Sequence, residues 1–417
     1  MAQKLTIALS LSLTGRYAAM GRQAEFAMRL FAGDVNASGG IVAARQRYEL
    51  ALECIDDQSR AARVEEIYRA LCGGSGPRII FGPYSSELTR GAAPITEAAG
   101  MLLINHGGAD DQIHEHGYRM IVGVLTPASE YMKSFIHLLT TLKFWRKRVA
   151  IVSSKSPFGR AVAAGAEREC TDRRARRRGV RVRLKYAGGF DPEETPEFLG
   201  RALRRNRINV MISAGSYQHD VAMTRLATRP HHNIPVIACV AAGVDAFGAD
   251  LGEDAEGTVG VSQWESAAEI RPEIGPEAAE FARRMRAANP NLACDYPAAQ
   301  AYAAGLIALA AVRASDSIEQ TRMRAALSDL RTKTFYGAFA IDRASGRQIG
   351  HQMTLVQWHA GRKITIEPEP NLGEAIEFPS GWRLLLASLH LVRIGRHDDS
   401  PEESDEEAGD DGKDEQG

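Results

Sequence analysis

The sequence lacks the features of several protein classes. Its 417 residues contain no run of 18 apolar residues, so no transmembrane helix is expected. The chain has no CxxC pair and no Cys/His cluster with zinc-finger spacing. Its five cysteines cannot all pair within one chain, and they are interpreted mostly as buried apolar thiols. Nothing in this pattern requires an oxidising compartment.

The sequence also lacks the common catalytic motifs. It has no GxGxxG after a strand, no GxxxxGK[ST], no GxSxG and no HExxH. No nucleophile is paired with a base, so no catalytic residue and no cofactor are expected. The cluster Asp110, Asp111, His114, Glu115 and His116 does not match a known metal-ligand spacing. It is interpreted as an exposed polar turn, and no metal site is expected.

The charge is small overall but uneven. The net charge is −1, yet residues 398–417 hold eleven Asp or Glu and a single Lys, a net charge of −10, so the rest of the chain carries +9. This acidic tail is almost free of apolar residues and is predicted to be disordered. A basic body attracts anionic ligands, or it is simply an arginine-rich solvated surface. The arginine run 173–178 has no interleaved aromatic residues, so no nucleic-acid partner is expected.

Short apolar runs alternate with longer segments of helical periodicity. Strands are predicted at Leu5–Leu13, Tyr48–Asp56, Arg78–Gly82 and Met101–Asn105, with helices at Arg22–Asn36, Ala61–Cys72 and Leu88–Ala99. The same alternation restarts after Pro127. Helices are predicted at Glu130–Leu142, Phe158–Arg177, Pro196–Asn206 and Gln218–Ala227, with strands at Arg148–Ser153, Val180–Tyr186, Val210–Ala214 and Pro235–Val240. Two such arrays predict an α/β protein with two doubly wound parallel-sheet lobes. Ligands of such sheets bind outside the carboxyl ends of the strands, here between the lobes.

Several segments, in their order and spacing, resemble one known family. These are LSLTGRYAAMG, DVNASGGI, ECIDDQSRAARVEEIYRAL, IIFGPYSSELTRGAAPI, MLLINHGGADD, VAIVSSKSPFGR, DYPAAQAYAAGLIALAAV and TFYGAFAIDRASGRQIGHQMTLVQW. From about residue 4 to 370 the chain resembles the type I periplasmic binding proteins. Specifically, it resembles the substrate-binding components of ABC transporters for branched-chain and other hydrophobic amino acids.

The resemblance implies two lobes joined by three hinge crossovers. Lobe one would comprise residues 1–125 and 253–330, and lobe two residues 126–252 and 331–370. Residues 371–397 would form a C-terminal extension before the acidic tail 398–417. Closure around a ligand would be a hinge motion.

The resemblance also implies a site for the polar head of a ligand. It places a ligand-binding serine at Ser86, in the Ser85-Ser86 turn before a helix, where an anion is favoured. The other interpretation of this turn is a plain helix cap. The loop His106-Gly107-Gly108-Ala109 aligns with a stretch that offers backbone groups to the ligand. His106 is either a donor in the cleft or a satisfied loop histidine.

Aromatic residues fall where the family holds the apolar part of its ligands. They are Tyr17, Phe158, Tyr217 and Tyr296, although a single aromatic residue is more often part of the core. Gln263 and Trp264 lie where the chain returns to lobe one. They are expected to line the cleft, with hinge packing as the alternative for Trp264.

One departure from the family concerns the ligand's ammonium group. Amino acid-binding members often have an acid after the strand that corresponds to Pro235–Val240, but here Val240, Ala241 and Ala242 occupy that region. Asp245 follows a few residues late. A buried ammonium without a carboxylate partner is costly, so a carboxylate or amide ligand becomes a serious option beside an amino acid.

The expected function is a solute-binding protein that clamps a small ligand, with an ABC transporter permease as its partner. The alternative is a cytoplasmic ligand sensor that acts on a regulatory protein. The first residues show no signal-peptide pattern. The protein is therefore expected to be periplasmic if a leader is missing from the sequence, and otherwise cytoplasmic.

Overall fold

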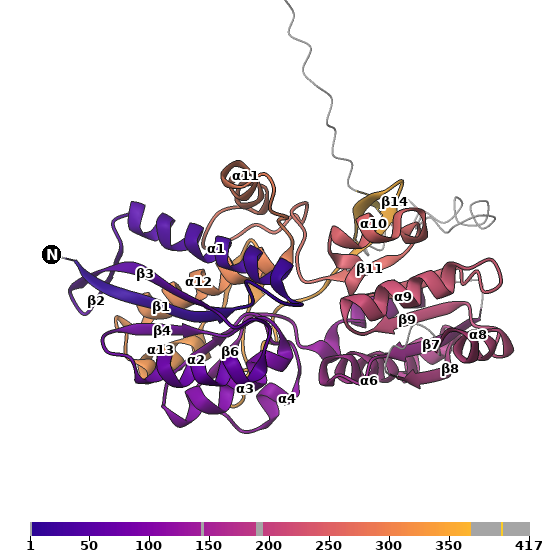
Figure 1. The fold of residues 1–417 in the computed structure, drawn as a ribbon, viewed down its shortest axis with the longest axis horizontal. Coiled ribbons are helices and arrows are strands. Elements are labelled where there is room, and N and C mark those ends of the chain that lie inside the picture. The colour runs from indigo at the N-terminus through magenta and orange to yellow at the C-terminus, as the bar shows by residue number, and fades with distance from the viewer. Residues whose placement is uncertain (1, 143–145, 189–194, 368–392, 395–417) are drawn as a thin grey trace, which may run out of the picture.

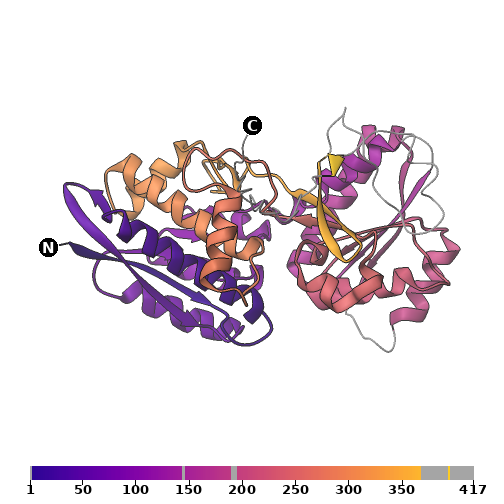
Figure 2. The same cartoon turned by 90° about the horizontal axis from the view of Figure 1, so that it is seen from above.

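The computed structural model describes residues 2–142, 146–188, 195–367 and 393–394. The expected C-terminal extension and acidic tail lie outside the described residues, apart from 393–394. In Figure 1, two lobes lie side by side along the long axis. Figure 2 shows the same two lobes from above, joined by the segments of chain that cross between them.

The first lobe is built on a six-stranded sheet. The strands follow the order β2 (Ile41–Ala43), β3 (Gln46–Asp56), β1 (Gln3–Leu11), β4 (Arg78–Phe81), β5 (Leu103–Asn105) and β6 (Ile121–Gly123). All neighbours are parallel except β2 and β3. A separate hairpin, β12 (Thr332–Thr334) and β13 (Gly337–Phe339), belongs to a late segment.

Helices cover both faces of this sheet, as the alternating pattern predicts. One face packs against α2 (Ala61–Gly73) and α3 (Ser86–Ala98), and the other against α1 (Ala18–Ala37) and α12 (Tyr296–Ser315). The lobe also contains α4 (Gln112–Glu115), α11 (Ala278–Ala288) and α13 (Gln320–Asp329). By length and composition α12 could cross a membrane. Most of its residues are instead buried in the core of this lobe.

The second lobe is built on an eight-stranded sheet. Its order is β16 (Arg393–Ile394), β15 (Arg362–Glu367), β14 (Thr354–His359), β11 (Val259–Ser262), β10 (Val236–Cys239), β9 (Val210–Ala214), β7 (Lys147–Ser153) and β8 (Val180–Ala187). The strands from β11 to β8 are parallel, and the β14–β16 edge is antiparallel. The sheets are therefore mixed but mostly parallel, which confirms the predicted α/β class.

Helices again cover both faces of the second sheet. One face packs against α8 (Thr195–Arg205) and α9 (Tyr217–Thr228), and the other against α5 (Lys133–Thr141), α6 (Pro157–Thr171) and α7 (Arg173–Arg177). Shorter elements are η1 (Ala128–Glu130), η2 (Ala241–Gly243), α10 (Ala246–Leu251) and η3 (Gly252–Ala255). The single helix predicted at Phe158–Arg177 is wrong. The chain breaks at Asp172, whose carboxylate accepts a hydrogen bond from the Arg174 N–H and caps α7.

The chain passes between the two sheets three times. It leaves the first sheet after β6, returns after β11, and enters the second sheet again at β14. The crossover expected near residue 253 lies later in the chain, after Ser262. The reason is that β11 still pairs with β10 and β14 in the second sheet. The third crossover follows residue 339 rather than 330, because the β12–β13 hairpin precedes it. Within this crossover, the Gly346 carbonyl accepts the Gly123 N–H at 2.9 Å.

Candidate functional site

The Ser85-Ser86 turn lies at the carboxyl end of β4, where α3 begins. Neither hydroxyl caps the helix: Ser85 occupies the N-cap position without a side-chain cap bond. Its Oγ is buried and makes no hydrogen bond of standard geometry to another described residue, although it interacts with the Tyr17 hydroxyl. The Ser86 Oγ accepts the N–H groups of Ala109 at 3.0 Å and Asp110 at 3.1 Å. Because a hydroxyl has one proton as well as two acceptor positions, Ser86 can still donate to an anion.

The second loop is held by Asn105, a residue that the sequence reading missed. Its Oδ1 accepts the N–H groups of Gly107 and Gly108, and its Nδ2 donates to the Gly108 carbonyl at 2.7 Å. A Cβ at Gly107 would lie 2.3 Å from the Pro83 carbonyl oxygen. The glycines therefore let this loop pack against the serine turn. The N–H groups expected to face a ligand are already bonded, those of the two glycines to Asn105 and that of Ala109 to Ser86.

His106 follows β5 and is fully buried. Neither ring nitrogen has a hydrogen-bond partner among the described residues. Burial lowers the pKa of His106 to about 4, so the ring is neutral near pH 7.

Tyrosines form an aromatic wall on the first lobe. The hydroxyls of Tyr84 and Tyr296 lie 3.0 Å apart. The ring of Tyr17 meets Tyr84 edge-on at 6.1 Å between centroids. Tyr17 and Tyr296 were predicted from sequence, whereas Tyr84 was missed although it directly precedes the serine turn. Two segments nearly 280 residues apart thus meet beside Ser85.

The predicted aromatic residues of the second lobe stand at helix starts. Phe158 lies in the first turn of α6 and meets Tyr131 edge-on at 5.5 Å between centroids. Tyr217 begins α9 and donates a 2.8 Å hydrogen bond to Asp250. Burial is the main cause that raises the pKa of Tyr217, so its hydroxyl stays protonated near neutral pH.

Gln263 lies inside the crossover after β11 and is 1% exposed. Its Nε2 donates to the Thr126 carbonyl and the Tyr131 hydroxyl, and its Oε1 accepts from the Thr126 N–H and the Tyr336 hydroxyl, all within 2.8–3.1 Å. The amide is fully used in joining two crossovers, so it does not line a cleft. Trp264 is buried, and its Nε1 donates a hydrogen bond to the Phe335 carbonyl.

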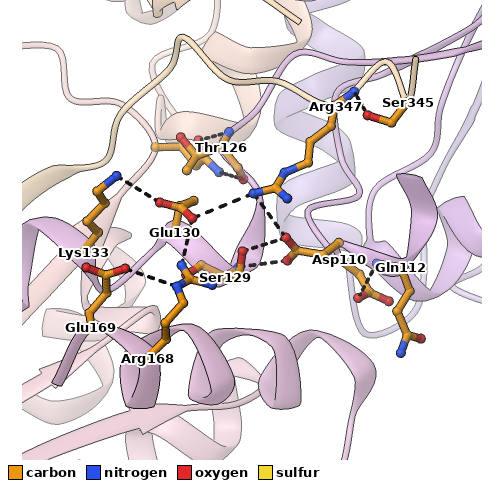
Figure 3. Close-up of polar contacts among 12 residues, drawn as sticks. Asp110, Gln112, Thr126, Ser129, Glu130, Lys133, Arg168, Glu169, Ser345 and Arg347 are labelled. Carbon is orange, nitrogen blue, oxygen red and sulfur yellow. Dashed lines mark hydrogen bonds and ion pairs between the residues drawn. The ribbon is translucent and has the colours of Figure 1, made fainter. Parts of the chain in front are cut away.

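An ionic network ties the first lobe to the second near these crossovers (Figure 3). Asp111 accepts hydrogen bonds from the Ser129 N–H at 2.9 Å and the Ser129 hydroxyl at 2.6 Å. The Arg347 guanidinium lies 3.7 Å from Asp111 and 3.8 Å from Glu130. Glu130 also pairs with Arg168 of α6 at 2.8 Å.

The cluster Asp110–His116 is not the exposed polar turn that the sequence suggested, because Asp110, Asp111 and His114 are buried and make polar contacts. Asp110 pairs with Arg90 at 3.3 Å, and His114 Nδ1 lies 3.0 Å from the Ser345 carbonyl oxygen. In the described ranges, no three His, Cys, Asp or Glu side chains are grouped so as to hold a metal ion. The five cysteines are all free, with Cys170 and Cys239 buried.

A second ionic cluster centres on Lys363 of β15. Its Nζ lies 3.1 Å from Asp245, 3.1 Å from Glu265 and 3.5 Å from Asp295, and it donates to the Gly243 carbonyl at 3.0 Å. Burial raises the pKa of Glu265 to about 7, although the Lys363 ammonium opposes the rise. The pKa of Asp295 is also raised by burial. The sequence reading noted Asp245 alone, because the other members come from distant segments.

The fold has two α/β lobes joined by three crossovers, with polar and aromatic groups at the carboxyl ends of the strands. This combination is that of a two-lobed solute-binding protein. The chain belongs to the periplasmic binding protein family, which it matches over residues 4–363. This confirms the resemblance seen in the sequence. The family consists of binding proteins rather than enzymes, in agreement with the expectation that the chain is not an enzyme.

Named relatives support this assignment. The leucine-specific-binding protein of Salmonella typhimurium is 23% identical over 230 residues, which are 50% of this chain and 59% of that protein. The Leu/Ile/Val-binding protein of Rhizobium johnstonii is 23% identical over 232 residues, 51% of this chain and 61% of that protein. The chain therefore matches less than two thirds of the length of these curated relatives.

Solved structures share the fold. A leucine-binding protein from Thermotoga maritima superimposes with a TM-score of 0.72 at 14% identity, covering 87% of this chain and 97% of that one. A solute-binding protein from R. palustris in complex with benzoate gives a TM-score of 0.69 at 17% identity, covering 88% and 95%. At these identities the likeness establishes the fold alone.

Proposed function

We propose that this solute-binding protein clamps a small ligand with a carboxylate or amide group between its lobes. The observation that carries the proposal is the serine turn after β4. The Ser86 hydroxyl accepts two backbone N–H groups, which leaves its own proton for donation to a ligand, and the buried Ser85 hydroxyl beside it has only the Tyr17 hydroxyl as a partner. A buried polar group without a partner is unfavourable, so an anionic or amide oxygen would satisfy it.

The aromatic residues give the apolar part of such a ligand its contact surface. Tyr17 and Tyr296 would contact it from the first lobe, and Phe158 and Tyr217 from the second. The crossovers that hold Gln263 would act as the hinge. Ligand pockets typically combine such aromatic surfaces with a few polar groups that fix orientation.

We infer that the partner is the permease of an ABC transporter and that the protein works in the periplasm. The relatives named for leucine, isoleucine and valine binding support a transport role. A cytoplasmic ligand sensor is the second candidate, favoured by five free cysteines. Fractionation of the tagged protein from its own cells distinguishes the two, because a purely cytoplasmic pool would contradict the transport role.

A thermal-shift screen with amino acids, aromatic acids, aliphatic acids and amides tests ligand binding. A ligand that binds only the folded state raises its apparent stability. Calorimetry then compares the best compound on the wild type and on Ser86→Ala, with the exposed hydroxyl variant Ser38→Ala as the matched control. We expect weaker binding by Ser86→Ala alone. The serine turn is not the site if Ser86→Ala binds as tightly as the control.

A further inference from the structure

A basic surface lies at the outer edge of the second sheet. The helix α7 leads into β8, which is the last strand in the order of that sheet. Figure 1 shows β8 next to α6 at this edge of the second lobe. Residues 172–185 contain eight Arg or Lys and a single acid, a net charge of +7. The basic edge is defined by the seven arginines of this segment, which are Arg173, Arg174, Arg176, Arg177, Arg178, Arg181 and Arg183.

The arginines of the basic edge have no acidic partner in the structure. All seven residues are exposed, and none of them takes part in an ion pair within the described ranges. The nearby Arg168 of α6 is instead paired with Glu130 at 2.8 Å. Asp172 is the single acid of the segment, and its carboxylate accepts the Arg174 N–H at 2.7 Å as the cap of α7.

The basic edge is continuous across the helix and the strand. The Arg181 guanidinium of β8 donates to the Arg176 carbonyl of α7 at 2.5 Å. On its outer side β8 has no partner strand among the described residues. Charged side chains on an edge strand hinder its pairing with other chains, which accounts for the charges on β8 but not for those on α7. Like charges this close repel one another, so an anionic cover would stabilise both elements.

The acidic tail 398–417 has the matching charge and belongs to the same lobe. Its net charge is −10, and it follows β16 at the opposite edge of the same sheet. Neighbouring strands are about 4.8 Å apart, so about 34 Å separate β16 from β8. A straight path takes about ten extended residues, and a path over a layer of helices takes about sixteen. Residues 410–417, with four acids and one lysine, can therefore reach the basic edge.

The surface nearest to the start of the tail repels it. The helix η3 lies beside β14, because the Gly257 N–H that follows η3 donates to the Trp358 carbonyl at 2.8 Å. Here α10 and η3 carry the exposed acids Asp250, Glu253 and Asp254. The two ends of the second sheet thus differ in the sign of their charge, and the resulting field directs an acidic segment toward the basic edge.

We propose that the acidic tail 398–417 docks on the basic edge of its own chain and covers the open side of β8. The docked tail supplies the carboxylates that the seven arginines lack. It shields the edge strand from pairing with other chains, and it keeps other anions away from the arginines. This surface is separate from the serine turn, so the proposal does not depend on the proposed function.

Zero-length carbodiimide cross-linking of the full chain tests this contact, because it joins a carboxylate only to an amine that touches it. Arg177→Lys places a reactive amine in the basic edge and keeps the charge. Arg313→Lys does the same at an exposed position of the first lobe and is the matched control. Mass spectrometry of the monomer is expected to find tail peptides joined to position 177 about tenfold more often than to position 313, since several surface ion pairs add up to such a preference.

Removing charge shows whether the arginines cause the contact. Added to Arg177→Lys, the pair Arg173→Gln and Arg174→Gln should lower the yield several-fold, whereas Arg45→Gln and Arg271→Gln, exposed changes in the first lobe, should leave it unchanged. The yield should also fall as the screening length drops from about 10 Å in 0.1 M salt to about 3 Å in 1 M salt.

Three results would overturn the proposal. The first is a yield of tail cross-links at position 177 that is no higher than at position 313. The second is a yield that the loss of neighbouring arginines does not change. The third is a cross-link that appears only between two copies of the chain and disappears on dilution, which would place the tail on a second molecule.

Discussion

Replacing Glu265 with glutamine is expected to remove a pH dependence of folding stability. Burial raises the pKa of Glu265 from its ordinary value of 4.5 to about 7. Between these values the folded state holds a proton that the unfolded state has lost. The stability that this group contributes is therefore complete below pH 4.5 and is lost as the pH rises through 7. Glutamine does not titrate, so the Glu265→Gln variant should not lose stability in this way as the pH rises.

The size of the effect follows from the two pKa values. The full difference corresponds to about 3 kcal/mol of unfolding free energy, of which about 2.5 kcal/mol falls between pH 5 and pH 8. Urea denaturation of the wild type and of Glu265→Gln at several pH values measures it. The stability of the variant relative to the wild type should rise by about that amount from pH 5 to pH 8.

A matched control separates this effect from a general loss of charge. Glu253→Gln makes the same chemical change at an exposed position of η3, so its difference from the wild type should stay nearly constant over the same range. A raised pKa of Glu265 is refuted if the difference in unfolding free energy between Glu265→Gln and the wild type also stays constant from pH 5 to pH 8. In that case the carboxylate would be ionised throughout, held by Lys363.

Four further substitutions test the candidate site, the crossovers and the packing of two helices. Ser86→Ala should weaken binding of a carboxylate ligand about tenfold, because it removes a hydrogen bond to a charged group, and calorimetry measures the change. Gln263→Ala should lower the unfolding free energy by about 3 kcal/mol in urea denaturation, since it leaves several buried partners unpaired. A loss below about 0.5 kcal/mol would contradict its role in joining the crossovers. Gly165→Ala would place a Cβ 1.9 Å from the Ser129 carbonyl oxygen and should cost about 2 kcal/mol. Thermal denaturation measures this loss, and in the same experiment Gly33→Ala, a helical position with open space, should stabilise the protein by about 0.5 kcal/mol or more.

The sequence was sufficient to predict the fold class because its signals are local. The strand predicted at Tyr48–Asp56 corresponds to β3 at Gln46–Asp56, and the helix predicted at Ala61–Cys72 to α2 at Ala61–Gly73. Hydrophobic periodicity reports on a few consecutive turns, which is all that such elements need. The break between α6 and α7 also has a local signal, since Asp172 is a good N-cap residue.

The crossovers were harder to place because they depend on pairing between distant strands. Nothing within Val259–Ser262 shows which sheet the strand joins; its neighbours in space are β10 and β14, and β14 lies almost 100 residues later. The role of Gln263 is hard to predict for the same reason. Its four hydrogen bonds reach three other segments, so its sequence position alone suggested a cleft residue.

In the candidate site too, features within one short segment could be predicted, whereas contacts between distant segments could not. The serine turn could be predicted because a short segment contains both hydroxyls and the helix start. The absence of an acid at Ala241 and Ala242 was also correctly read, but it did not mean that the region lacks carboxylates. Asp295 from α12 and Glu265 from a crossover come within 3.5 Å of the same ammonium. A missing residue at one aligned position therefore says little about local charge when a fold brings several segments to one place.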